Sequence, residues 1–317
     1  MATIRGVHGW ITAAEDRADP MVGVVLAVAA ISTSAIFIRW SGAPSVVKAF
    51  YRVLFMTAAV APFAGRDVEA FRTVSRTDLT LATVSGLALA AHFAAWFESL
   101  VWTSVAASVT LVTTQPVFVA VGAALLLDER LTPRILGGMA VALTGAVGMS
   151  VGPLVVGPLQ AGGDVVASLR TAVAATPGQF YGNALALAGA VLAGVYVLAG
   201  RSLRQRLPLF AYTFVVYAVC TVALGGLAVG TGAALLGYPR VEWALFLAMA
   251  LLPGMVGHTV INWALKYVES SVVSVSLLGE PVGSTLLALV LLGEAPETVM
   301  VVGGAVVLVG IYVTGQG

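Results

Sequence analysis

Two stretches of this 317-residue chain decide its fold, because the second repeats the first: LVWTSVAASVTLVTTQPVFVAVGAALLLDERLTPRILGGMAVALTGAV (Leu100–Val147) and LKYVESSVVSVSLLGEPVGSTLLALVLLGEAPETVMVVGGAVVLVGIY (Leu265–Tyr312). At a constant shift of 165 residues, four sparse residues coincide: Pro116 with Pro281, Glu129 with Glu294, Gly138 with Gly303 and Gly145 with Gly310. Coincident leucines and valines prove little in apolar sequence. A proline, a glutamate and two glycines in the same order and spacing indicate an internal repeat.

The composition is that of a membrane protein. Apolar residues make up 59% of the chain and charged residues 10%, whereas soluble domains carry roughly 25% charged residues. A helix needs about 20 apolar residues to cross a bilayer. The sequence predicts ten such helices, at Met21–Trp40, Ser45–Ala64, Leu79–Leu100, Val105–Leu127, Thr132–Val151, Tyr181–Gly200, Leu209–Gly230, Trp243–Leu265, Val272–Leu292 and Pro296–Thr314.

The repeat divides the chain into two halves of five helices. We expect an N-terminal segment at 1–20, a first repeat at 21–151, a linker rich in Gly, Pro and Ala at 152–179, and a second repeat at 180–317. Because five is odd, the second repeat must enter the membrane from the opposite side. The predicted fold is an all-α integral membrane protein with ten transmembrane helices in two inverted repeats, which is typical of secondary transporters.

Lysine and arginine predict the orientation, because they are retained on the cytoplasmic side of a membrane. With the N-terminus inside, 11 of the 16 Lys and Arg residues lie in cytoplasmic segments, among them Arg66, Arg72 and Arg76. Residues Met1–Asp19 lack the basic-then-apolar order of a secretion signal. We therefore expect a multi-pass protein of the cytoplasmic membrane, with both termini in the cytoplasm and the linker outside.

Charge and motifs exclude several classes of function. A net charge of +1 gives no sign of a nucleic-acid partner. Cys220 is the single cysteine, which rules out an internal disulfide and a cysteine-based zinc site. The sequence has neither an HExxH metal pair nor a GxxxxGK[ST] ATP-binding loop. We expect no enzyme activity, no metal and no cofactor, so that any driving force must come from a gradient.

Short motifs extend the likeness beyond the two stretches. In the first half they are His92-Phe93 with Trp96, Ser99-Leu100, Thr103–Ala106, Leu111–Phe118 and Glu129-Arg130-Leu131. In the second half they are Gly257-His258, Asn262-Trp263, Leu265-Lys266-Tyr267, Gly279–Val282 and Gly293-Glu294. Together they resemble the EamA repeat of the drug/metabolite transporter superfamily, over nearly all of the chain from Met21 onward.

The resemblance implies two inverted five-helix repeats that move small organic solutes by alternating access. Similar proteins carry amino acids and other metabolites outward, so we expect a permease that exports amino acids or related compounds. A multidrug or cation exporter of the same superfamily is one alternative, and a membrane sensor or scaffold is another. The expected partners are a small-molecule solute and the lipid bilayer, with no nucleic acid and with a homodimer left open.

Glu280 is the clearest candidate for a transport site. A charged side chain in the bilayer centre costs ~3 kcal/mol, so it faces a cavity or a partner. Pro281 removes a backbone donor and frees carbonyl groups of the preceding turn, and a carboxylate beside free carbonyls suits an ammonium group or a proton. The repeat mate is Gln115 beside Pro116, and we expect both prolines to kink their helices. In the structural alternative, Glu280 pairs with another protein group.

Arg52, in the second predicted helix, is the second candidate. We expect it ~6–10 Å from Glu280 in depth. A zwitterion such as an amino acid could then lie between them, with its carboxylate on Arg52 and its ammonium on Glu280. Aligning Pro44 with Pro208 puts Val216 at the position of Arg52, so the repeat itself does not require a charge there. Alternatively, Arg52 extends outward or pairs directly with an acid.

Other polar and aromatic residues lie at membrane depth. His92 and His258 occupy equivalent depths in the third and eighth helices; they either relay a proton or hold helices together by hydrogen bonds. Asn262 offers a polar contact, although helix–helix hydrogen bonding is its commoner role. Three aromatic residues either wall a cavity or pack helices together: Trp96, Trp263 and Tyr51.

Glu129 and Glu294 end equivalent helices of the two halves. This symmetry predicts a structural role that is repeated in both halves, and we expect each carboxylate to cap the start of the next helix, at Thr132 or Glu297. Neither glutamate is a predicted binding residue.

Overall fold

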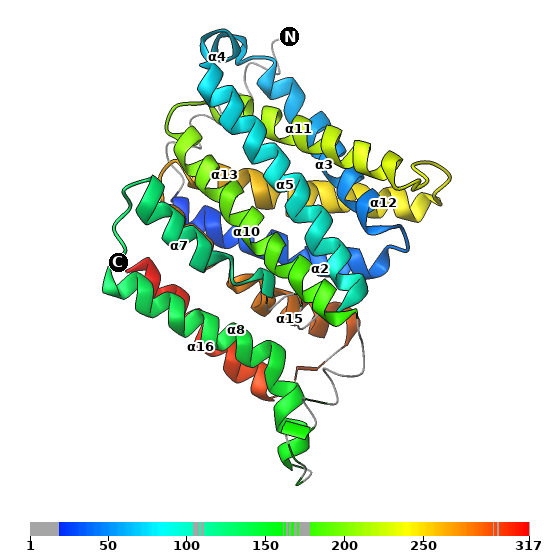
Figure 1. The fold of residues 1–317 in the computed structure, drawn as a ribbon, viewed down its shortest axis with the longest axis vertical. Helices are drawn as coiled ribbons and strands as arrows, with labels where there is room; N and C mark the ends of the chain where they lie inside the picture. Colours follow the sequence, from blue (N-terminus) through cyan, green and yellow to red (C-terminus); the bar gives the residue numbers. More distant parts are fainter. Residues whose placement is uncertain are drawn as a thin grey trace.

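In the computed structural model, all the described secondary structure is helical (Figure 1). The structure describes residues 19–103, 108, 111–160, 162, 164, 166–167, 170, 178–293, 295–296 and 298–316. Its helices are α2 (Pro20–Trp40), α3 (Ser45–Ala64), α4 (Val68–Thr73), α5 (Arg76–Trp102), α7 (Gln115–Leu126), α8 (Pro133–Gln160), α10 (Gln179–Arg204), α11 (Leu209–Gly230), α12 (Arg240–Met249), η1 (Ala250–Thr259), α13 (Val260–Ala264), α14 (Ser270–Ser276), α15 (Gly279–Leu292) and α16 (Thr298–Gly315).

Within the described residues, eight helices are long and apolar enough to cross a membrane, which confirms a multi-pass membrane protein. They are α2, α3, α5, α10, α11, the continuous α12–η1–α13, the α14–α15 pair, and α16. Two further apolar helices are shorter, Gln115–Leu126 and Pro133–Met149. The predicted spans Ser45–Ala64 and Leu209–Gly230 have the bounds of α3 and α11, because a proline stands at the N-cap of each and stops the helix from extending backward.

Other helices extend beyond the apolar runs that predict them. α5 begins at Arg76 rather than Leu79, because the Ser75 hydroxyl caps its polar first turn by accepting the Asp78 N–H at 3.0 Å. α8 continues past Val151 to Gln160. Counting apolar residues locates the part of a helix that is in the membrane, whereas caps and turns decide where the helix ends.

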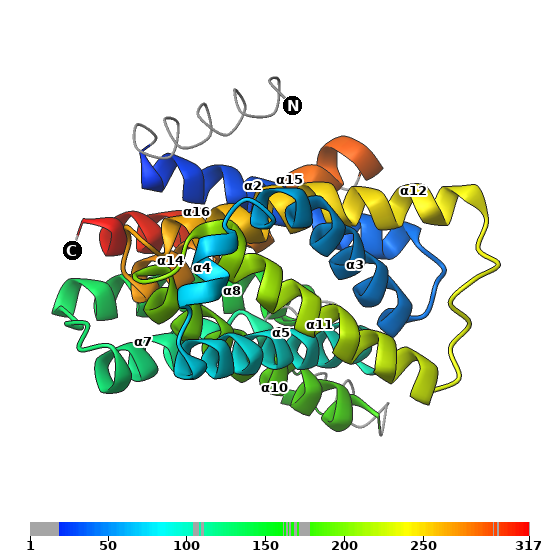
Figure 2. The same ribbon diagram turned by 90° about the horizontal axis from the view of Figure 1, so that it is seen from above.

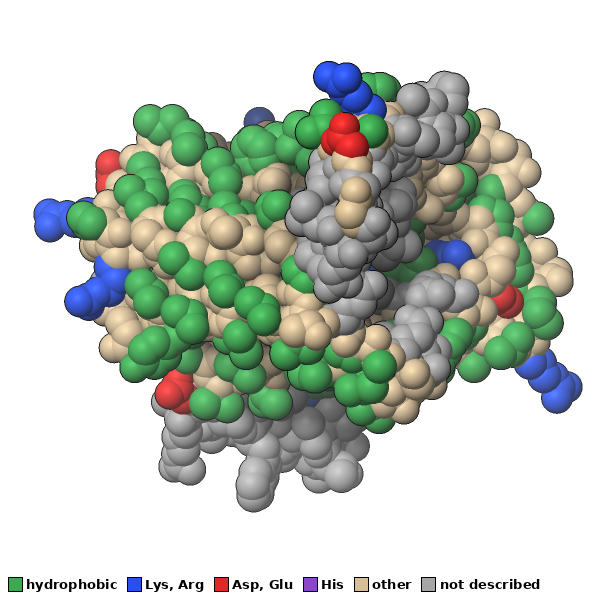
Figure 3. All heavy atoms as spheres, turned by 90° about the horizontal axis from the view of Figure 1, so that it is seen from below, with side chains coloured by type: hydrophobic (Ala, Val, Ile, Leu, Met, Phe, Trp, Pro, Cys, Tyr) green, Lys and Arg blue, Asp and Glu red, His purple; other side chains and the backbone are tan. Residues whose placement is uncertain are grey.

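In the bundle, helices from the first half of the chain pack against helices from the second half. α3 packs on α11, α8 on α16, α5 on α10, and α2 on η1. The helices run roughly between the left and right sides of Figures 1 and 2. We call the left side, where α7 ends and α14 begins, the Glu129 end, and the right side, where α12 begins, the Glu242 end. Figure 3 views the α8–α16 side: hydrophobic side chains spread across it and most charged ones stand near its outline, as suits a lipid-facing surface.

α8 and α16 are in close antiparallel contact through glycines. A methyl group added to Gly138 would lie 2.7 Å from the Gly310 carbonyl oxygen, and one added to Gly145 would lie 2.6 Å from that of Gly303. Small residues allow backbones to approach this closely. In the repeat alignment Gly138 corresponds to Gly303 and Gly145 to Gly310. Each glycine therefore contacts the repeat mate of the other.

Both repeat-related prolines follow a break in their helix. A turn at Leu277–Leu278 separates α14 from α15, and a turn at Thr113–Thr114 precedes α7. The sequence predicts kinks inside continuous helices; instead Pro116 and Pro281 lie in the first turns of α7 and α15. Proline is well placed there, because the first turn of a helix does not use its N–H groups for helical bonds.

The helix formed by α12, η1 and α13 is continuous but irregular. Its middle part, Ala250–Thr259, is π-helical and contains Pro253, which cannot donate a backbone hydrogen bond. Such segments are rare and occur frequently at functional sites. His258 is part of this segment.

Candidate functional site

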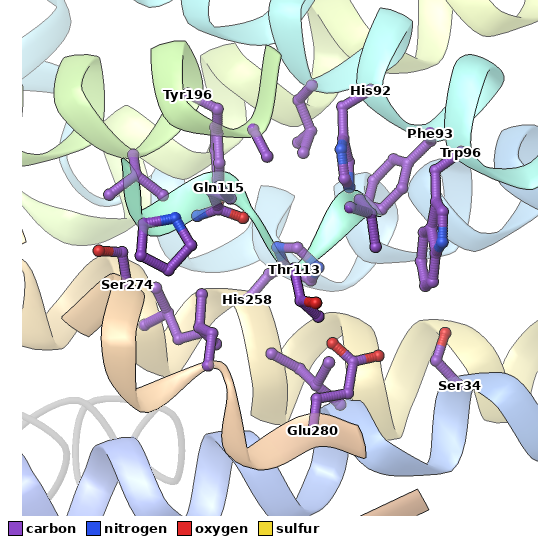
Figure 4. A pocket seen from close by; sticks show the side chains of 18 of the residues that line it. Ser34, His92, Phe93, Trp96, Thr113, Gln115, Tyr196, His258, Ser274 and Glu280 are labelled. Atoms are coloured by element: carbon purple, nitrogen blue, oxygen red, sulfur yellow. The ribbon is translucent and has the colours of Figure 1, made fainter. Parts of the chain in front are cut away.

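A cavity lies in the middle of the bundle, lined by residues of α2, α3, α5, α7, α10, η1, α13, α14 and α15 together with Val112 and Thr113. Its empty space is about 740 Å³ when the open mouth is included. Figure 4 shows how its lining side chains converge from both halves of the chain. Six predicted site residues line it: Arg52, His92, Trp96, Gln115, His258 and Glu280. Pro116 lines it as well.

Glu280 is held by its backbone and presents its carboxylate to the cavity. Its N–H donates to the Leu277 carbonyl at 2.9 Å, which closes the turn before α15. The Ser32 hydroxyl donates to the Glu280 carbonyl at 3.3 Å, and so joins α15 to α2. Figure 4 shows the carboxylate directed toward Thr113 across the cavity. Among the described residues no hydrogen bond or ion pair reaches it.

Arg52 is the largest fully buried side chain of the described residues, with 1% of it exposed. Its Nη1 donates to the Ser34 hydroxyl at 3.0 Å, and its guanidinium carbon lies 4.7 Å from the centre of the Phe93 ring. Its Nε has no partner among the described residues. Arg52 and Glu280 do not form an ion pair within 4.0 Å, although their charges attract each other across the cavity.

Three more polar nitrogen atoms of cavity-lining side chains are buried without a partner in the described part of the chain: Trp96 Nε1, Gln115 Nε2 and His258 Nδ1. Buried polar groups in native proteins are nearly always hydrogen-bonded, so each such exception needs an explanation. A bound polar solute or ordered water supplies one. The cavity thus combines one carboxylate with several buried nitrogen atoms that have no partner among the described residues.

The two histidines differ in their environment. His92 Nδ1 lies 2.8 Å from the Gly189 carbonyl oxygen, so this ring joins α5 to α10. Its ring also stacks on Trp96, with centroids 5.9 Å apart. The His258 side chain makes only ring contacts among the described residues, with Phe93 at 5.4 Å and Tyr196 at 6.0 Å between centroids. His92 therefore has the helix-packing contact, while Nδ1 of His258 has no partner among the described residues.

Three predicted residues do not line the cavity. Tyr51 belongs to an aromatic cluster at the Glu242 end and donates its hydroxyl hydrogen to the Leu235 carbonyl at 2.5 Å. Asn262 lies behind the cavity wall, where its amide donates to the Tyr196 hydroxyl at 2.5 Å and supports it. The Trp263 ring fills the space beside Gly23, where a methyl group would meet it at 2.4 Å.

Some lining residues are absent from the sequence prediction: Ser34, Phe93, Thr113, Tyr196 and Ser274. A hydroxyl at membrane depth is a weak signal, because it can bond its own helix backbone at i−4. Ser34 and Phe93 stand out because they contact Arg52, and these contacts exist only in the folded bundle. In the described residues no group of three His, Cys, Asp or Glu side chains could hold a metal ion.

Known proteins resemble the chain over nearly its whole length. The sequence matches the EamA-like transporter family at residues 20–151 and 180–316. An uncharacterized transporter of Archaeoglobus fulgidus is 26% identical over 294 residues, which cover 92% of this chain and 94% of that protein. A solved protein structure superposes with a TM-score of 0.72 at 20% identity, covering 95% of this chain and 98% of that one. At this identity the superposition shows a shared fold.

Proposed function

Because the chain belongs to the EamA-like transporter family, we propose that it is a secondary transporter that exports amino acids or related small metabolites across the cytoplasmic membrane by alternating access. The chain is a multi-pass membrane transporter whose solute is a small molecule. The class of solute, the direction of transport and the mechanism are our proposal.

One observation carries it: two opposite charges face the same cavity without pairing. An unpaired buried charge costs several kcal/mol. A solute with one negative and one positive group could pair with both charges and would therefore stabilise the bundle on binding. An amino acid has these two groups. Its carboxylate would accept from the free Nε of Arg52, and its ammonium would donate to Glu280.

Nε1 of Trp96 and Nε2 of Gln115 would donate to the remaining acceptors of the solute, and Nδ1 of His258 would donate or accept according to its tautomer. Gln115 and Glu280 stand at equivalent breaks in the two halves, so they could approach the solute from opposite sides. Half-helix ends with freed backbone groups are the usual location of transporter binding sites.

The contact between α8 and α16 supports the ten-helix, inverted-repeat architecture. Gly138 meets Gly310 and Gly145 meets Gly303. This cross-pairing of repeat mates is what a two-fold axis between antiparallel helices produces. With α7 and α8 as the fourth and fifth spans, the eight long helices become ten.

The cytoplasm would face the Glu129 end in this proposal, because the basic residues of predicted cytoplasmic segments gather there. Single cysteines at Arg72 and Arg204 in a Cys220→Ala background should then be shielded from an impermeant thiol reagent in intact cells. Labelling of either position from outside would overturn the orientation.

The alternatives have less support. A cationic drug would be repelled by the buried guanidinium of Arg52, which disfavours a multidrug exporter. The segment Gly148–Gly152 reads GMSVG and fits the GxSxG pattern of hydrolases, but α8 runs unbroken through it. A hydrolase serine requires a sharp strand-to-helix turn, so this match carries no enzyme proposal.

Transport by the purified protein in liposomes tests the proposal. The panel should hold amino acids, the amines that remain after their decarboxylation, nucleobases and cationic dyes. We expect exchange of zwitterions to exceed that of the matching amines. Exchange of dyes alone would favour the multidrug alternative, and the absence of any exchange above empty liposomes would refute the transport proposal.

A further inference from the structure

A buried polar cluster at the Glu129 end lies outside the cavity. The Glu129 carboxylate, whose side chain is 5% exposed, accepts from Arg201 Nε at 3.0 Å. It also accepts from the Ser270 N–H at 3.1 Å, the Ser270 hydroxyl at 3.0 Å and the Ser271 hydroxyl at 3.3 Å. We call Glu129, Arg201, Ser270 and Ser271 the Glu129 latch.

The latch caps a helix that does not cap itself. α14 has seven residues, and its N-cap residue Glu269 makes no side-chain capping bond. So short a helix is marginal alone, and a carboxylate at its N-terminus satisfies free N–H groups and the positive end of the helix dipole. The sequence predicts Glu129 as a cap for its own next helix at Thr132. Instead the Thr132 hydroxyl caps α8 by accepting the Ile135 N–H at 3.2 Å.

The chain positions Glu129 by an unusual turn. Asp128 has φ 54°, the only positive φ among the described non-glycine residues. The Glu129 N–H donates to the Ala123 carbonyl at 3.2 Å, six residues back, as in a helix end with a left-handed residue. A left-handed Asp is uncommon and costs about 1 kcal/mol or more. The surrounding contacts of Glu129 therefore have to compensate for this conformation.

The latch connects elements that line the cavity. Gln115 on α7, Tyr196 on α10 and Ser274 on α14 all face it. Toward the Glu129 end, these helices are joined by Glu129 and Arg201. Arg201 also donates through Nη1 to the Leu265 carbonyl at 2.9 Å, which ties in the end of α13. α14 carries the latch at its first residue and ends at the Leu277–Leu278 turn beside Glu280.

The sequence repeats this latch only in part. Other polar contacts near the ends include the ion pair of Asp78 on α5 with Arg206 at 2.8 Å, and the Ser41 hydroxyl, which donates to Glu242 on α12 at 2.5 Å. In the repeat alignment, however, Ser270 and Ser271 correspond to Val105 and Ala106. These two residues have no hydroxyl to donate. Glu294, the mate of Glu129, lies outside the described residues, as does Glu297.

From this asymmetry we propose that Glu129 is a gating residue. The closed latch keeps α7, α10 and α14 together at the Glu129 end, and its release lets α14 move about the Leu277–Leu278 turn and opens the cavity to that end. The inference rests on the proposed alternating-access function. It adds to that function the group that controls access from one side.

A cysteine in the cavity wall tests the gate. Ala193 lines the cavity and is small enough to be replaced by Cys in a Cys220→Ala background. An impermeant thiol reagent is added to either side of proteoliposomes of sorted orientation. We expect Glu129→Gln to speed labelling from the Glu129 end roughly tenfold, because charge-assisted hydrogen bonds of the closed state are lost. Labelling from the Glu242 end should slow or stay unchanged.

Two further variants keep the test decisive. Ser270→Ala with Ser271→Ala removes the hydroxyl donors but retains the ion pair, and should give a smaller change in the same direction if Glu129→Gln fails to fold. Glu98→Gln is the matched control, because Glu98 bonds only Trp102 of its own helix among the described residues. Equal labelling rates in wild type and folded latch variants would overturn the gate.

Transport assays separate this inference from the proposed function. In the latch variants, solute binding measured on the detergent-solubilised protein should stay within about twofold of wild type, while the exchange rate changes. If labelling shifts but neither wild type nor any variant transports, the proposed function fails while the latch still controls access to the cavity. If wild type transports and labelling does not shift, only the gate fails.

Discussion

The break before α7 and the break before α15 match in the sequence alignment but carry different side chains. Gln115 and Glu280 each precede a proline at the same break and line the same cavity, yet only one is a charged group. Arg52 faces this cavity, whereas Val216, its mate on α11, is fully buried in the apolar core. The prolines and the helix breaks therefore match between the aligned positions, whereas the charges do not.

The matching features suit the conformational change of a transporter, whereas the differing charges suit the binding of its solute. Matching breaks and matching glycine contacts suit two arrangements related by symmetry, as alternating access needs. A solute with unlike ends, in contrast, requires a site with unlike sides. Substitutions that make the halves more alike should consequently harm binding before they harm folding.

Glu280→Gln makes the two halves alike and should have the largest effect. We expect exchange in proteoliposomes to fall at least roughly 30-fold, since losing one partner of a desolvated charge contact costs 2–5 kcal/mol. The melting temperature should hold, because the carboxylate bonds no described protein group. Glu98→Gln serves as the control, and normal exchange by the Glu280 variant would remove this residue from the mechanism.

Arg52→Gln should change selectivity, with an effect of about 1.5–3 kcal/mol on binding of solutes that carry a carboxylate. Decarboxylated amines should be spared, and Glu280→Gln should show the reverse preference. Titration of both solute types into the four-member variant cycle measures this. A stability loss in each single variant that the double variant restores, without inversion of preference, would instead indicate an internal ion pair.

Gly138→Ala tests the symmetric contact of α8 and α16. Its methyl group would meet the Gly310 carbonyl at 2.7 Å. A methyl group added to Gly137 would instead have no atom within 4 Å. Overpacking costs about 1–3 kcal/mol, so Gly138→Ala should lower the melting temperature while Gly137→Ala leaves it unchanged or raises it. Gly310→Ala should match Gly138→Ala; a tolerated Gly138 variant would argue against the close contact.

Replacing each histidine by phenylalanine should have the smallest effects. The two variants should differ clearly, because one should affect stability and the other solute binding. His92→Phe loses the bond to the Gly189 carbonyl and should cost about 1 kcal/mol of unfolding free energy. His258→Phe should keep the stability and weaken solute binding by a similar amount. Denaturation and binding titrations of both variants measure the two quantities. Equal behaviour of the two would mean that His258 has no ligand-facing role.

Helix positions and the main charged candidates were predictable from the sequence. Ser45–Ala64 has the bounds of α3 because a proline precedes an apolar run. Glu280 and Arg52 stand out because a charge at membrane depth is expensive unless it has a function or a partner. In the structure both line one cavity, and their roles in binding are our proposal.

The facing of the helices was not predictable. Tyr51, Asn262 and Trp263 lie at plausible depths but turn away from the cavity, whereas Ser34 and Tyr196 turn toward it. In a soluble helix the polar face marks the outside. Here lipid and protein interior favour the same apolar side chains, so the pattern along a helix carries little information about its rotation.

The amino-acid sequence by itself determined the class of protein, the sequence repeat and the two repeat-related prolines at which the helices are interrupted. It also determined that each charge in a membrane helix is costly. These properties depend only on composition and on spacing along one chain. Only the tertiary structure decided that Arg52 bonds Ser34 rather than Glu280, and that Glu129 caps α14 rather than α8. Both contacts join residues that are far apart in the chain or in different helices. Such partners are selected by how the helices pack and rotate against one another, and no local pattern specifies that choice.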